Sequence, residues 1–370
     1  MDSFKGCLSS LEAGHSVKSG VRSALPEAEI KLIGLADGGE GTVTSLVESL
    51  GGGYLQSWVS NPLGKKVLAQ SGLVGGLSIL EVAASSGLQL IDRSQPGPSY
   101  TNSYGLGEMI LAHLDRGSRK FLIGLGGSAT NDLGVGMLAA LGFKFLDGAG
   151  KELAPYPWEL RKISSIDDSS VDKRIFQSSF TLACDVDNPL FGQDGAAHVF
   201  GPQKGASRKE IIFLDRLARH FSSLVGQKYG SSFEYSKGAG AAGGLGYAFK
   251  SFLGAEIRPG SQLIFDLIGL EEDIRQADLL ITGEGSLDYQ SLRGKAPVAL
   301  AKLCKKHGLA VLALAGSVQA SRELDDIFTA YFSIQSQPLS LEEALDPATT
   351  RNNLRNTSLQ LMNIYKLRRP

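Results

Sequence analysis

Short apolar segments alternate with amphipathic helical segments along this chain, and this alternation limits its fold more than any other feature. An apolar segment at 120–125 is followed by a helical pattern near 133–141. Towards the C-terminus, apolar segments lie at 278–281, 310–315 and 328–334, with a helical pattern at 295–307 between the first two. A strand that is followed by a helix and another strand places the two strands in parallel. The sequence therefore predicts an α/β fold built on parallel sheets.

The N-terminal part continues this pattern. Ser9 and Glu12 have the spacing of a capping box, and an apolar helical stripe follows them. A strand is predicted at 30–35, and then a glycine loop and a second helix. Two later regions interrupt the alternation: 54–86 shows short strands with turns, and 143–180 is polar with several prolines and acids. Both regions could belong to a second domain that is inserted into the first.

Charge and cysteine content exclude several classes of protein. The 370 residues include 37 basic and 38 acidic side chains, which give a net charge of −1, so a general nucleic-acid or membrane-surface binder is not expected. The three cysteines form no C-x-x-C pair and support neither a disulfide framework nor a zinc site. The start does not resemble a signal peptide, and no apolar run reaches the roughly 18 residues of a membrane span. We expect a soluble, cytoplasmic protein.

Glycine is in excess, with 46 residues of 370 against an average of about 7%. Much of it lies in segments that also carry acids, hydroxyls or lysines. Backbone N–H groups of glycine loops can bind phosphate, whereas carboxylates repel phosphate unless a magnesium ion lies between them. Glycine loops, acids and lysines together are the parts of a phosphoryl-transfer site. Seven segments have this character: 2–6, 36–42, 126–132, 184–189, 201–205, 237–244 and 282–288.

Two other kinds of protein stay open from these residues alone. Gly124–Ala129 matches the G-x-G-x-x-A pattern of dinucleotide-binding proteins, and Asp147 follows about 20 residues later, which leaves a dinucleotide-dependent oxidoreductase open. A non-catalytic sensor of a nucleotide or a sugar acid would also keep the glycine loops, although it would not need so many acids. No G-x-x-x-x-G-K-[ST] motif occurs, which argues against a P-loop enzyme.

Taken together, these segments resemble the glycerate kinase type 1 family over residues 2–334. The family motifs A-D-G-G-E-G-T, G-G-S-A-T-N-D and G-P-Q-K-G-A are present at 36–42, 126–132 and 201–206. The motifs D-S-[FY]-K, A-C-D-V-x-N-P-L and G-A-G-A-A-G-G are present at 2–5, 183–190 and 238–244. T-G-E-G-x-x-D-x-Q with a following G-K is present at 282–290 and 294–295. So many matches in the same order make the resemblance specific.

The resemblance implies two α/β domains with the active site in the cleft between them. Residues 1–58 and 275–370 would form a three-layer parallel-sheet domain, and 59–274 would form the inserted α/β domain. It also implies ATP-dependent phosphorylation of D-glycerate, giving 2-phosphoglycerate rather than 3-phosphoglycerate, with ATP and Mg²⁺ as cofactors. The partners would be these small molecules, with no nucleic acid and no membrane, and the protein would be a monomer or a homodimer.

Roles for single residues follow from the matching positions. Lys5, Lys204 and Lys295 are assigned to anionic groups, with Lys204 on the glycerate carboxylate and the other two nearer the phosphates. The base that accepts the substrate hydroxyl proton is predicted to be Asp185, with Asp37 second. Glu284, Asp288 and Glu40 are predicted to hold Mg²⁺. The remaining residues predicted to bind ATP are Gly126, Gly127, Ser128, Thr130, Asn131, Gly283 and Gly285.

Two positions depart from the family pattern. Leu133 stands where the family usually has a glycine after Asp132, and a leucine here could narrow a pocket; Asp132 itself could act in the site or cap a helix. The second departure is at the start. Family members have a strand rich in Val and Ile before D-S-[FY]-K, whereas only Met1 precedes this motif here. We expect that the native protein begins several residues upstream.

Overall fold

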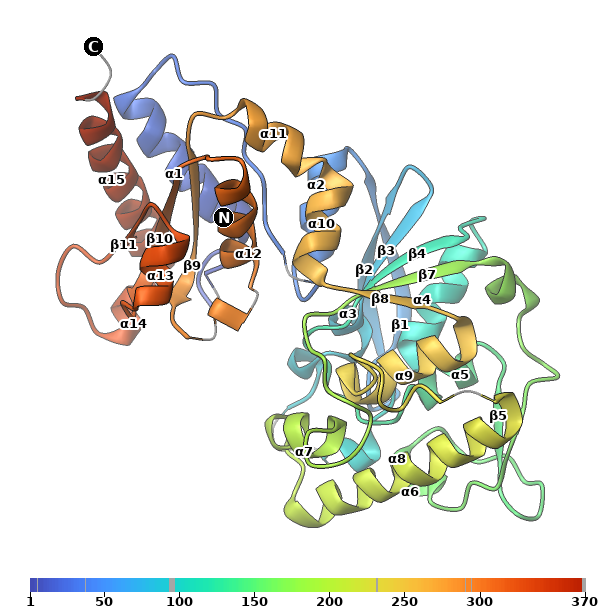
Figure 1. The fold of residues 1–370 in the computed structure, drawn as a ribbon. Coiled ribbons are helices and arrows are strands. Elements are labelled where there is room, and N and C mark those ends of the chain that lie inside the picture. The colour runs from blue at the N-terminus through green and yellow to red at the C-terminus, as the bar shows by residue number, and fades with distance from the viewer. Residues whose placement is uncertain are drawn as a thin grey trace. The chain divides into compact units, whose positions relative to one another are not determined.

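The computed structural model describes residues 1–4, 6–36, 38–92, 97–230, 232–289, 291–293 and 295–367. The chain forms two compact units (Figure 1): the terminal unit, Met1–Asp37 with Ser261–Pro370, and the central unit, Gly38–Gly260. The sequence-based boundaries were 58/59 and 274/275, so helix α2 (Thr42–Leu50) had been expected in the terminal unit. Val43 and Val47 of α2 instead pack against Gly72 of the central unit's sheet. Among the described residues, no helix combines the length and apolar character that crossing a bilayer requires.

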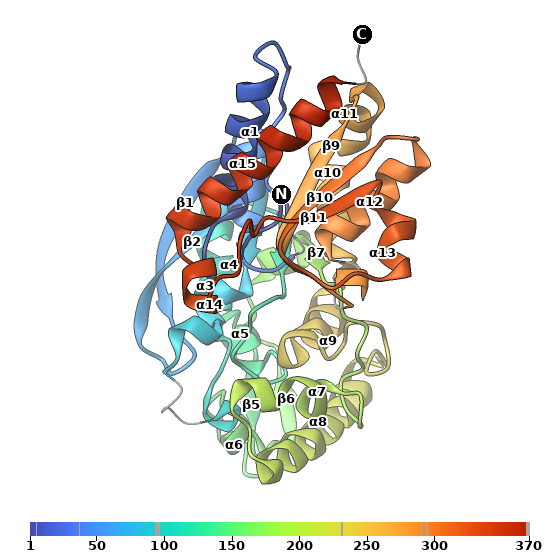
Figure 2. The ribbon, with the colours of Figure 1, turned by 90° about the vertical axis from the view of Figure 1, so that its left-hand side faces the viewer.

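The terminal unit is a three-layer α/β sandwich. Strands β9 (Leu280–Leu287), β10 (Val311–Val318) and β11 (Ala330–Ser333) form a parallel sheet in the order β11-β10-β9. Alternate residues of a strand point to opposite faces of its sheet. Leu312 and Leu314 of β10 share a core with α1 (Ser10–Ala24) and α15 (Pro347–Lys366). Ala313 and Ala315 share a second core with α12 (Ala296–Lys306) and α13 (Arg322–Ile327), so helices cover both faces (Figure 2).

Local signals in the terminal unit are partly confirmed. The capping box that begins α1 is present, with Glu12 N donating to Ser9 Oγ at 3.3 Å and Ser9 N to Glu12 Oε2 at 3.0 Å. Residues 30–35 were predicted to be a strand and form none. Two hydrogen bonds join this segment to Met1, from the Met1 amine to Ile33 O (3.2 Å) and from Leu35 N to Met1 O (2.8 Å). Two such bonds are too few for a strand ladder.

A second correction concerns the predicted glycine loop at 282–288. Strand β9 runs through it as far as Leu287, and Gly283 pairs with Leu314 of β10. A Cβ on Gly283 would lie 1.9 Å from the carbonyl oxygen of Leu314. The glycine therefore permits a close approach between strands here, where a turn had been expected. The other elements of this part are α10 (Gly260–Ile268), α11 (Leu270–Gln276), η5 (Ser291–Arg293) and α14 (Leu341–Ala344).

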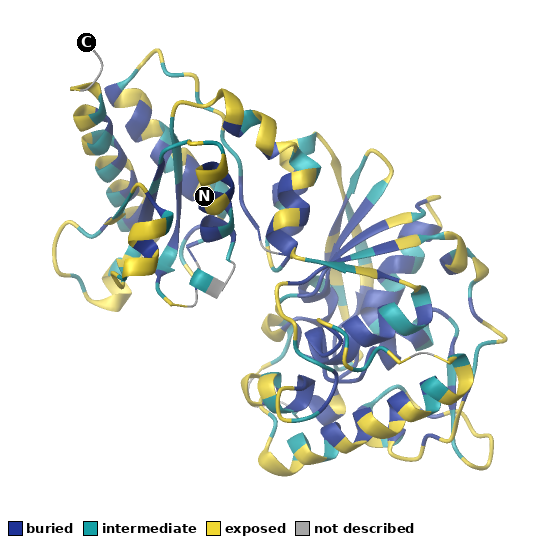
Figure 3. Ribbon diagram, in the orientation of Figure 1, coloured by how far each residue is buried: buried dark blue, intermediate teal, exposed yellow. Residues whose placement is uncertain are grey.

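The central unit is built on a six-stranded sheet in the order β1-β2-β3-β4-β7-β8. The first three strands pair antiparallel, and β3, β4, β7 and β8 pair in parallel. Helices α4 (Tyr104–Leu114), α5 (Val135–Ala140) and α9 (Ala241–Leu253) contribute to the large core on one face, drawn in dark blue in Figure 3, and α2 packs on the other. The strand bounds are β1 Gly53–Ser60, β2 Lys66–Val74, β3 Leu77–Glu81, β4 Lys120–Gly124, β7 Ser179–Ala183 and β8 Glu256–Arg258.

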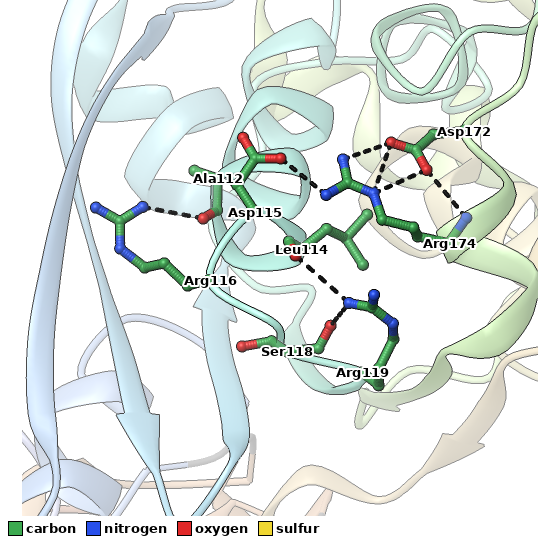
Figure 4. Close-up of polar contacts among 8 residues, drawn as sticks. All are labelled: Ala112, Leu114, Asp115, Arg116, Ser118, Arg119, Asp172 and Arg174. Carbon is green, nitrogen blue, oxygen red and sulfur yellow. Dashed lines mark hydrogen bonds and ion pairs between the residues drawn. The ribbon is translucent and has the colours of Figure 1, made fainter.

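Shorter elements complete this unit: α3 (Val82–Ser86), α6 (Pro157–Leu160), α7 (Ala196–Phe200), α8 (Arg208–Tyr229), β5 (Lys144–Leu146), β6 (Ser165–Asp167), η1 (Leu88–Leu90), η2 (Pro98–Tyr100), η3 (Lys173–Gln177) and η4 (Pro202–Lys204). Figure 4 shows how η3 is joined to the end of α4. The Arg174 guanidinium lies 2.6 Å from Asp172 and 2.9 Å from Asp115. Its bonds to Asp172 lower the pKa of that carboxyl group.

One buried polar cluster joins two strands to α4. Both ring nitrogens of His113 lie 2.7 Å from a serine hydroxyl, Nε2 from Ser71 Oγ on β2 and Nδ1 from Ser78 Oγ on β3. The side chain is 1% exposed, and this burial lowers the pKa of His113 from 6.5 to about 4. The folded central unit therefore holds this histidine in its neutral form.

Acid should destabilise the central unit through His113. In the unfolded chain the ring binds a proton near pH 6.5, whereas in the folded protein it does so only near pH 4. Its stabilising contribution is thus complete above pH 6.5 and is lost as the pH falls towards 4, by roughly 3 kcal/mol over that range. Urea unfolding at several pH values measures this loss. His113→Gln should lose less stability than the wild type between pH 6.5 and 4.5, and His15→Gln, at an exposed position, should follow the wild type. Equal losses for all three proteins would contradict the assignment.

Candidate active site

Two motifs of the central unit lie at the carboxyl ends of its parallel strands. The parallel strands β3, β4 and β7 end at Glu81, Gly124 and Ala183, which pair in register with one another. The G-G-S-A-T-N-D motif follows β4 and the C-D-V-D-N-P segment follows β7. Ligands of parallel sheets bind outside the carboxyl ends of the strands. The two motifs therefore lie where a ligand of a parallel sheet is expected to bind, as the sequence predicted.

Lys204 lies against the motif that follows β4. It is 9% exposed, and its Nζ donates to Ser128 Oγ at 2.9 Å and to the Thr130 carbonyl oxygen at 2.7 Å. Among the described residues no carboxylate forms an ion pair with it, although the charge of Asp132 acts on it from a greater distance. Burial lowers the pKa of Lys204 from 10.5 to about 7. An ammonium group that is buried with neutral partners can gain an anion as its third partner.

Other polar groups beside Lys204 lack partners. Thr130 Oγ1 and Asn131 Nδ2 are buried and form no hydrogen bond with any residue that the structure describes. Buried polar groups are usually hydrogen-bonded, so a pair of unpartnered ones is a mark of a ligand site. Gly126 and Gly127 precede Ser128, and Gly127 has a left-handed φ of 73°. The structure thus brings together Lys204 and the five motif residues that the sequence assigned to ATP.

Asp132 has a structural role in the same loop. Its Oδ2 accepts hydrogen bonds from Ser103 N (2.7 Å), Ser103 Oγ (2.7 Å) and Gly136 N (2.9 Å), and it is fully buried. Burial raises the pKa of this carboxyl group, and the four bonds from Ser103, Gly134 and Gly136 oppose that effect. Of the two roles open from the sequence, the geometry favours capping the start of α5 and fixing the loop to Ser103.

Two residues with strained backbone conformations lie in neighbouring segments at the end of this loop. Leu133 and Ala242 are the non-glycine residues with left-handed φ among the described residues, at 59° and 50°. Ala242 begins a left-handed turn that continues through Gly243 and Gly244, and Leu133 N donates to Gly243 O at 3.0 Å. A Cβ on Gly243 would lie 2.1 Å from the Thr130 carbonyl oxygen, the acceptor of Lys204. This turn therefore sets the position of the group that holds Lys204.

The terminal unit carries a second candidate site on β9. Glu284 Oε2 lies 2.8 Å from Lys295 Nζ, which follows β9 and precedes α12. The Glu284 side chain is 5% exposed, and its other oxygen, Oε1, is buried without a hydrogen-bond partner in the described part of the chain, as is Thr282 Oγ1. Gly283 and Gly285 lie within the strand on either side of Glu284. The sequence assigned Lys295 and Glu284 to different roles, whereas the structure joins them as an ion pair.

Asp288 lies just beyond the end of β9. Its Oδ2 accepts from Ser286 Oγ at 3.3 Å and its Oδ1 from Ser291 N at 3.3 Å, and Ser286 Oγ is 3.0 Å from Ser317 Oγ on β10. Within the described ranges, no three His, Cys, Asp or Glu side chains are grouped as a metal site would need. The unpartnered Glu284 Oε1 fits the position of one protein ligand to an Mg²⁺ ion, which is commonly bound through one or two carboxylates and substrate phosphates.

Of the four remaining predicted residues, two lie in loops at exposed positions and two lie outside the described residues. Asp185 is exposed after β7, and its Oδ1 accepts from Gly260 N at 2.8 Å. Glu40 is exposed in the loop before α2. Lys5 and Asp37 lie outside the described residues. The G-x-G-x-x-A match does not continue into a helix as a dinucleotide site would, since α5 begins only at Val135 and Asp147 lies in a turn after β5.

Sequence reasoning missed Glu81, which ends β3 and is 9% exposed. Its Oε1 accepts a hydrogen bond from Val43 N at 2.7 Å. Burial, more than any other influence, raises the pKa of this carboxyl group to about 7. An acid at the end of an apolar strand was a signal that the sequence offered, but its partner lies 38 positions away along the chain.

Comparison with known proteins supplies the family. Residues 1–366 match the Glycerate kinase family. The chain is 41% identical to a glycerate kinase from Bacillus subtilis (strain 168), over 94% of this chain and 92% of the relative, and 40% identical to glycerate 2-kinase from Escherichia coli (strain K12), over 93% and 91%. A crystal structure from Salmonella typhimurium LT2, described as glycerate kinase 2, superimposes with a TM-score of 0.89 at 39% identity, over 99% of this chain and 96% of that one. The two-domain α/β fold expected from the sequence is thereby confirmed, and the chain belongs to the glycerate kinase family.

Proposed function

We propose that this protein transfers the γ-phosphoryl group of ATP to D-glycerate and that its product is 2-phosphoglycerate. Family membership supports the reaction, and the name of the Escherichia coli relative, glycerate 2-kinase, supports the 2-phosphate. The observation on which the proposal chiefly rests is Lys204, a buried ammonium group with hydroxyl and carbonyl partners and no ion-paired carboxylate among the described residues. Glycerate carries the carboxylate that such a group lacks.

The site around Lys204 is proposed to bind glycerate. Since Lys204 Nζ contacts both Ser128 and Thr130, an anion that reaches Lys204 also reaches these two residues. We therefore propose that Ser128, Thr130 and Asn131 bind glycerate, the phosphate acceptor, although the sequence assigned them to ATP. The unpartnered Thr130 Oγ1 and Asn131 Nδ2 would bind the carboxylate or a hydroxyl of glycerate. Gly127 would let the substrate approach the backbone, whereas the space beside Gly126 is taken by Gly39.

The Glu284–Lys295 pair is proposed to serve the phosphates of ATP. Lys295, with about a quarter of its side chain exposed, keeps one side open to a ligand. Glu284 Oε1 and Asp288 would hold the Mg²⁺ that accompanies ATP, and the ion would neutralise phosphate charge when bound. Gly283 and Gly285 would line this site. Asp185, with Asp37 second, stays our prediction for the base, and Lys5 and Glu40 stay predictions for phosphate and Mg²⁺.

Product analysis tests the function directly. The purified protein is incubated with ATP, Mg²⁺ and D-glycerate, ATP consumption is followed by a coupled assay, and the product is identified by phosphorus NMR. We expect turnover with the phosphate on O2. Exclusive formation of the 3-phosphate would overturn the regiochemistry. Tight glycerate binding without ATP consumption would replace the kinase with a non-catalytic sensor.

Loss of the Lys204 charge should weaken glycerate binding more than ATP binding. Hydrogen bonds to a charged group contribute roughly 1.5–3 kcal/mol, so Lys204→Met should raise the KM for glycerate roughly 10- to 100-fold while the KM for ATP changes little. In the wild type, the pKa of about 7 predicts weaker glycerate binding as the pH rises above 7, because the ammonium form is lost. Steady-state kinetics with each substrate varied measures both effects. A larger change in the KM for ATP would refute the assignment.

The Gly243 turn should be needed for activity beyond its contribution to stability. An alanine Cβ at this position would meet the Thr130 carbonyl oxygen, which should displace the acceptor of Lys204. Gly243→Ala should therefore reduce kcat/KM for glycerate at least about tenfold. Gly254→Ala is the matched control, because Gly254 also has a left-handed φ, 63°, but open space around it. The control should lose roughly 1–2 kcal/mol of stability and keep kcat/KM. Equal kcat/KM in both variants would contradict this role.

Glu284 should affect the chemical step and the response to Mg²⁺. Glu284→Gln removes the charge that pairs with Lys295 and weakens the unpartnered oxygen as a metal ligand, so we expect kcat to fall roughly 10²-fold and to recover in part at raised Mg²⁺. Asp273→Asn is the control, since Asp273 forms an ion pair with Lys31 in the same unit and should leave kcat unchanged. A folded Glu284→Gln protein with wild-type kcat would remove Glu284 from the site. If raised Mg²⁺ restores none of the lost kcat, Glu284 is not a metal ligand, and its contact with Lys295 is then its remaining role.

A further inference from the structure

Glu81 caps a helix that has no capping side chain of its own. Helix α2 begins after Gly41, whose φ is 93°, and Gly41 offers no side-chain acceptor to the first turn. Glu81, at the end of β3, supplies one: its Oε1 accepts from Val43 N at 2.7 Å, and the Gly41 and Thr42 backbone N–H groups also stabilise its charged form. A carboxylate at a helix N-terminus is favoured by the exposed N–H groups and the helix dipole.

In the segment just before this helix, Gly38–Gly41, the first two residues are closely packed. Gly38 O accepts from Gly126 N at 3.3 Å, and a Cβ on Gly38 would lie 2.7 Å from the Ala183 Cβ. A Cβ on Gly126 would lie 2.6 Å from Gly39 Cα. At its far end, Gly39 O accepts from Thr42 Oγ1 at 2.8 Å. The segment thus lies on the ends of β4 and β7, next to Gly126 of the glycerate loop, and Glu81 at the end of β3 fastens its exit into α2.

We propose that Glu81 is a positioning residue for phosphoryl transfer, whose carboxylate fixes the Gly38–Gly41 segment against the strand ends that carry the glycerate site. The inference rests on the proposed function, because it needs a reaction whose rate depends on this segment. Glu40 lies within the segment, so the backbone that carries this side chain is held by the same contact. Small displacements of a reacting group lower rates steeply, and this is how a side chain without substrate contact can control kcat.

The charge of Glu81 matters as well as its shape. Burial makes ionisation of this carboxyl group costly, and the negative charge of Glu40 adds to that cost, whereas the N–H groups of α2 reduce it. Glutamine fills the same space, but one of the two accepting oxygens is replaced by an NH₂ group. This NH₂ group would face backbone N–H groups at the start of α2, to which it cannot hydrogen-bond. Glu81→Gln should therefore loosen the segment while leaving the surrounding core in place. Aspartate keeps the charge and is shorter by one methylene group.

The test compares Glu81→Gln and Glu81→Asp with Glu108→Gln, a control in the same unit. Glu108, on α4, also accepts a backbone N–H, from Ser60 of the edge strand β1 at 2.5 Å. We expect Glu81→Gln to lower kcat roughly 10- to 100-fold with the KM for glycerate changed less than threefold. Hydrogen exchange of the peptide covering 38–50 should be faster than in the wild type. Glu81→Asp should recover part of kcat, and Glu108→Gln should keep both kcat and exchange at 38–50.

Three outcomes would overturn the inference. The first is wild-type kcat in folded Glu81→Gln. The second is a loss of melting temperature in Glu81→Gln with unchanged kcat per folded molecule, which would make Glu81 a structural cap only. The third applies if Glu81→Gln does not fold: a folded Glu81→Asp with unchanged kcat and unchanged exchange at 38–50 would then exclude the positioning role. If the wild type itself does not phosphorylate glycerate, the proposed function fails, and faster exchange at 38–50 in Glu81→Gln would still identify the cap.

Discussion

The contact between the Lys204 ammonium group and the Thr130 carbonyl oxygen organises the candidate site of the central unit. A buried cation is costly when only neutral groups surround it, so its position has to be imposed by the rest of the structure. The Gly243 turn packs closely against the Thr130 carbonyl group. Asp132 forms hydrogen bonds that join the same loop to Ser103 and to the start of α5. An anionic ligand would offset part of this electrostatic cost when it binds.

The two lysine sites follow opposite electrostatic designs. Lys295 has a carboxylate, Glu284, at 2.8 Å. Lys204 has no such partner among the described residues, and its pKa is near neutrality. A compensated cation suits a ligand that arrives with its own metal ion, because the local charge changes little on binding. An uncompensated one suits a small anion such as a carboxylate, because a neutral molecule of similar shape would leave the ammonium group unpaired.

Local chemistry explains what the sequence could predict. The capping box of Ser9 and Glu12 and the strand–helix alternation of the C-terminal part of the terminal unit depend on neighbouring residues, and they are found close to where the sequence placed them, unlike the strand expected at 30–35. The motif order also identified the family. Contacts between distant segments were out of reach: Lys204 and Ser128 are 76 positions apart, and Glu81 and Val43 are 38 apart. The sequence predicts a loop at Gly283, whereas the structure has a strand there. The absence of a side chain lets β9 approach β10 at Leu314, and this reason becomes visible only when the neighbouring strand is known.

Leu133 combines an unfavourable backbone conformation with a well-buried side chain. Its left-handed backbone costs about 1–2 kcal/mol, which the glycine usual at this position avoids. Its side chain, however, is 1% exposed and belongs to the large core of the central unit. Returning to glycine would relieve the backbone but leave a cavity, and removal of a buried leucine side chain typically costs about 2–5 kcal/mol. The neighbouring core thus makes an unfavourable backbone conformation the better of two alternatives, and Leu133→Gly would be a destabilising substitution.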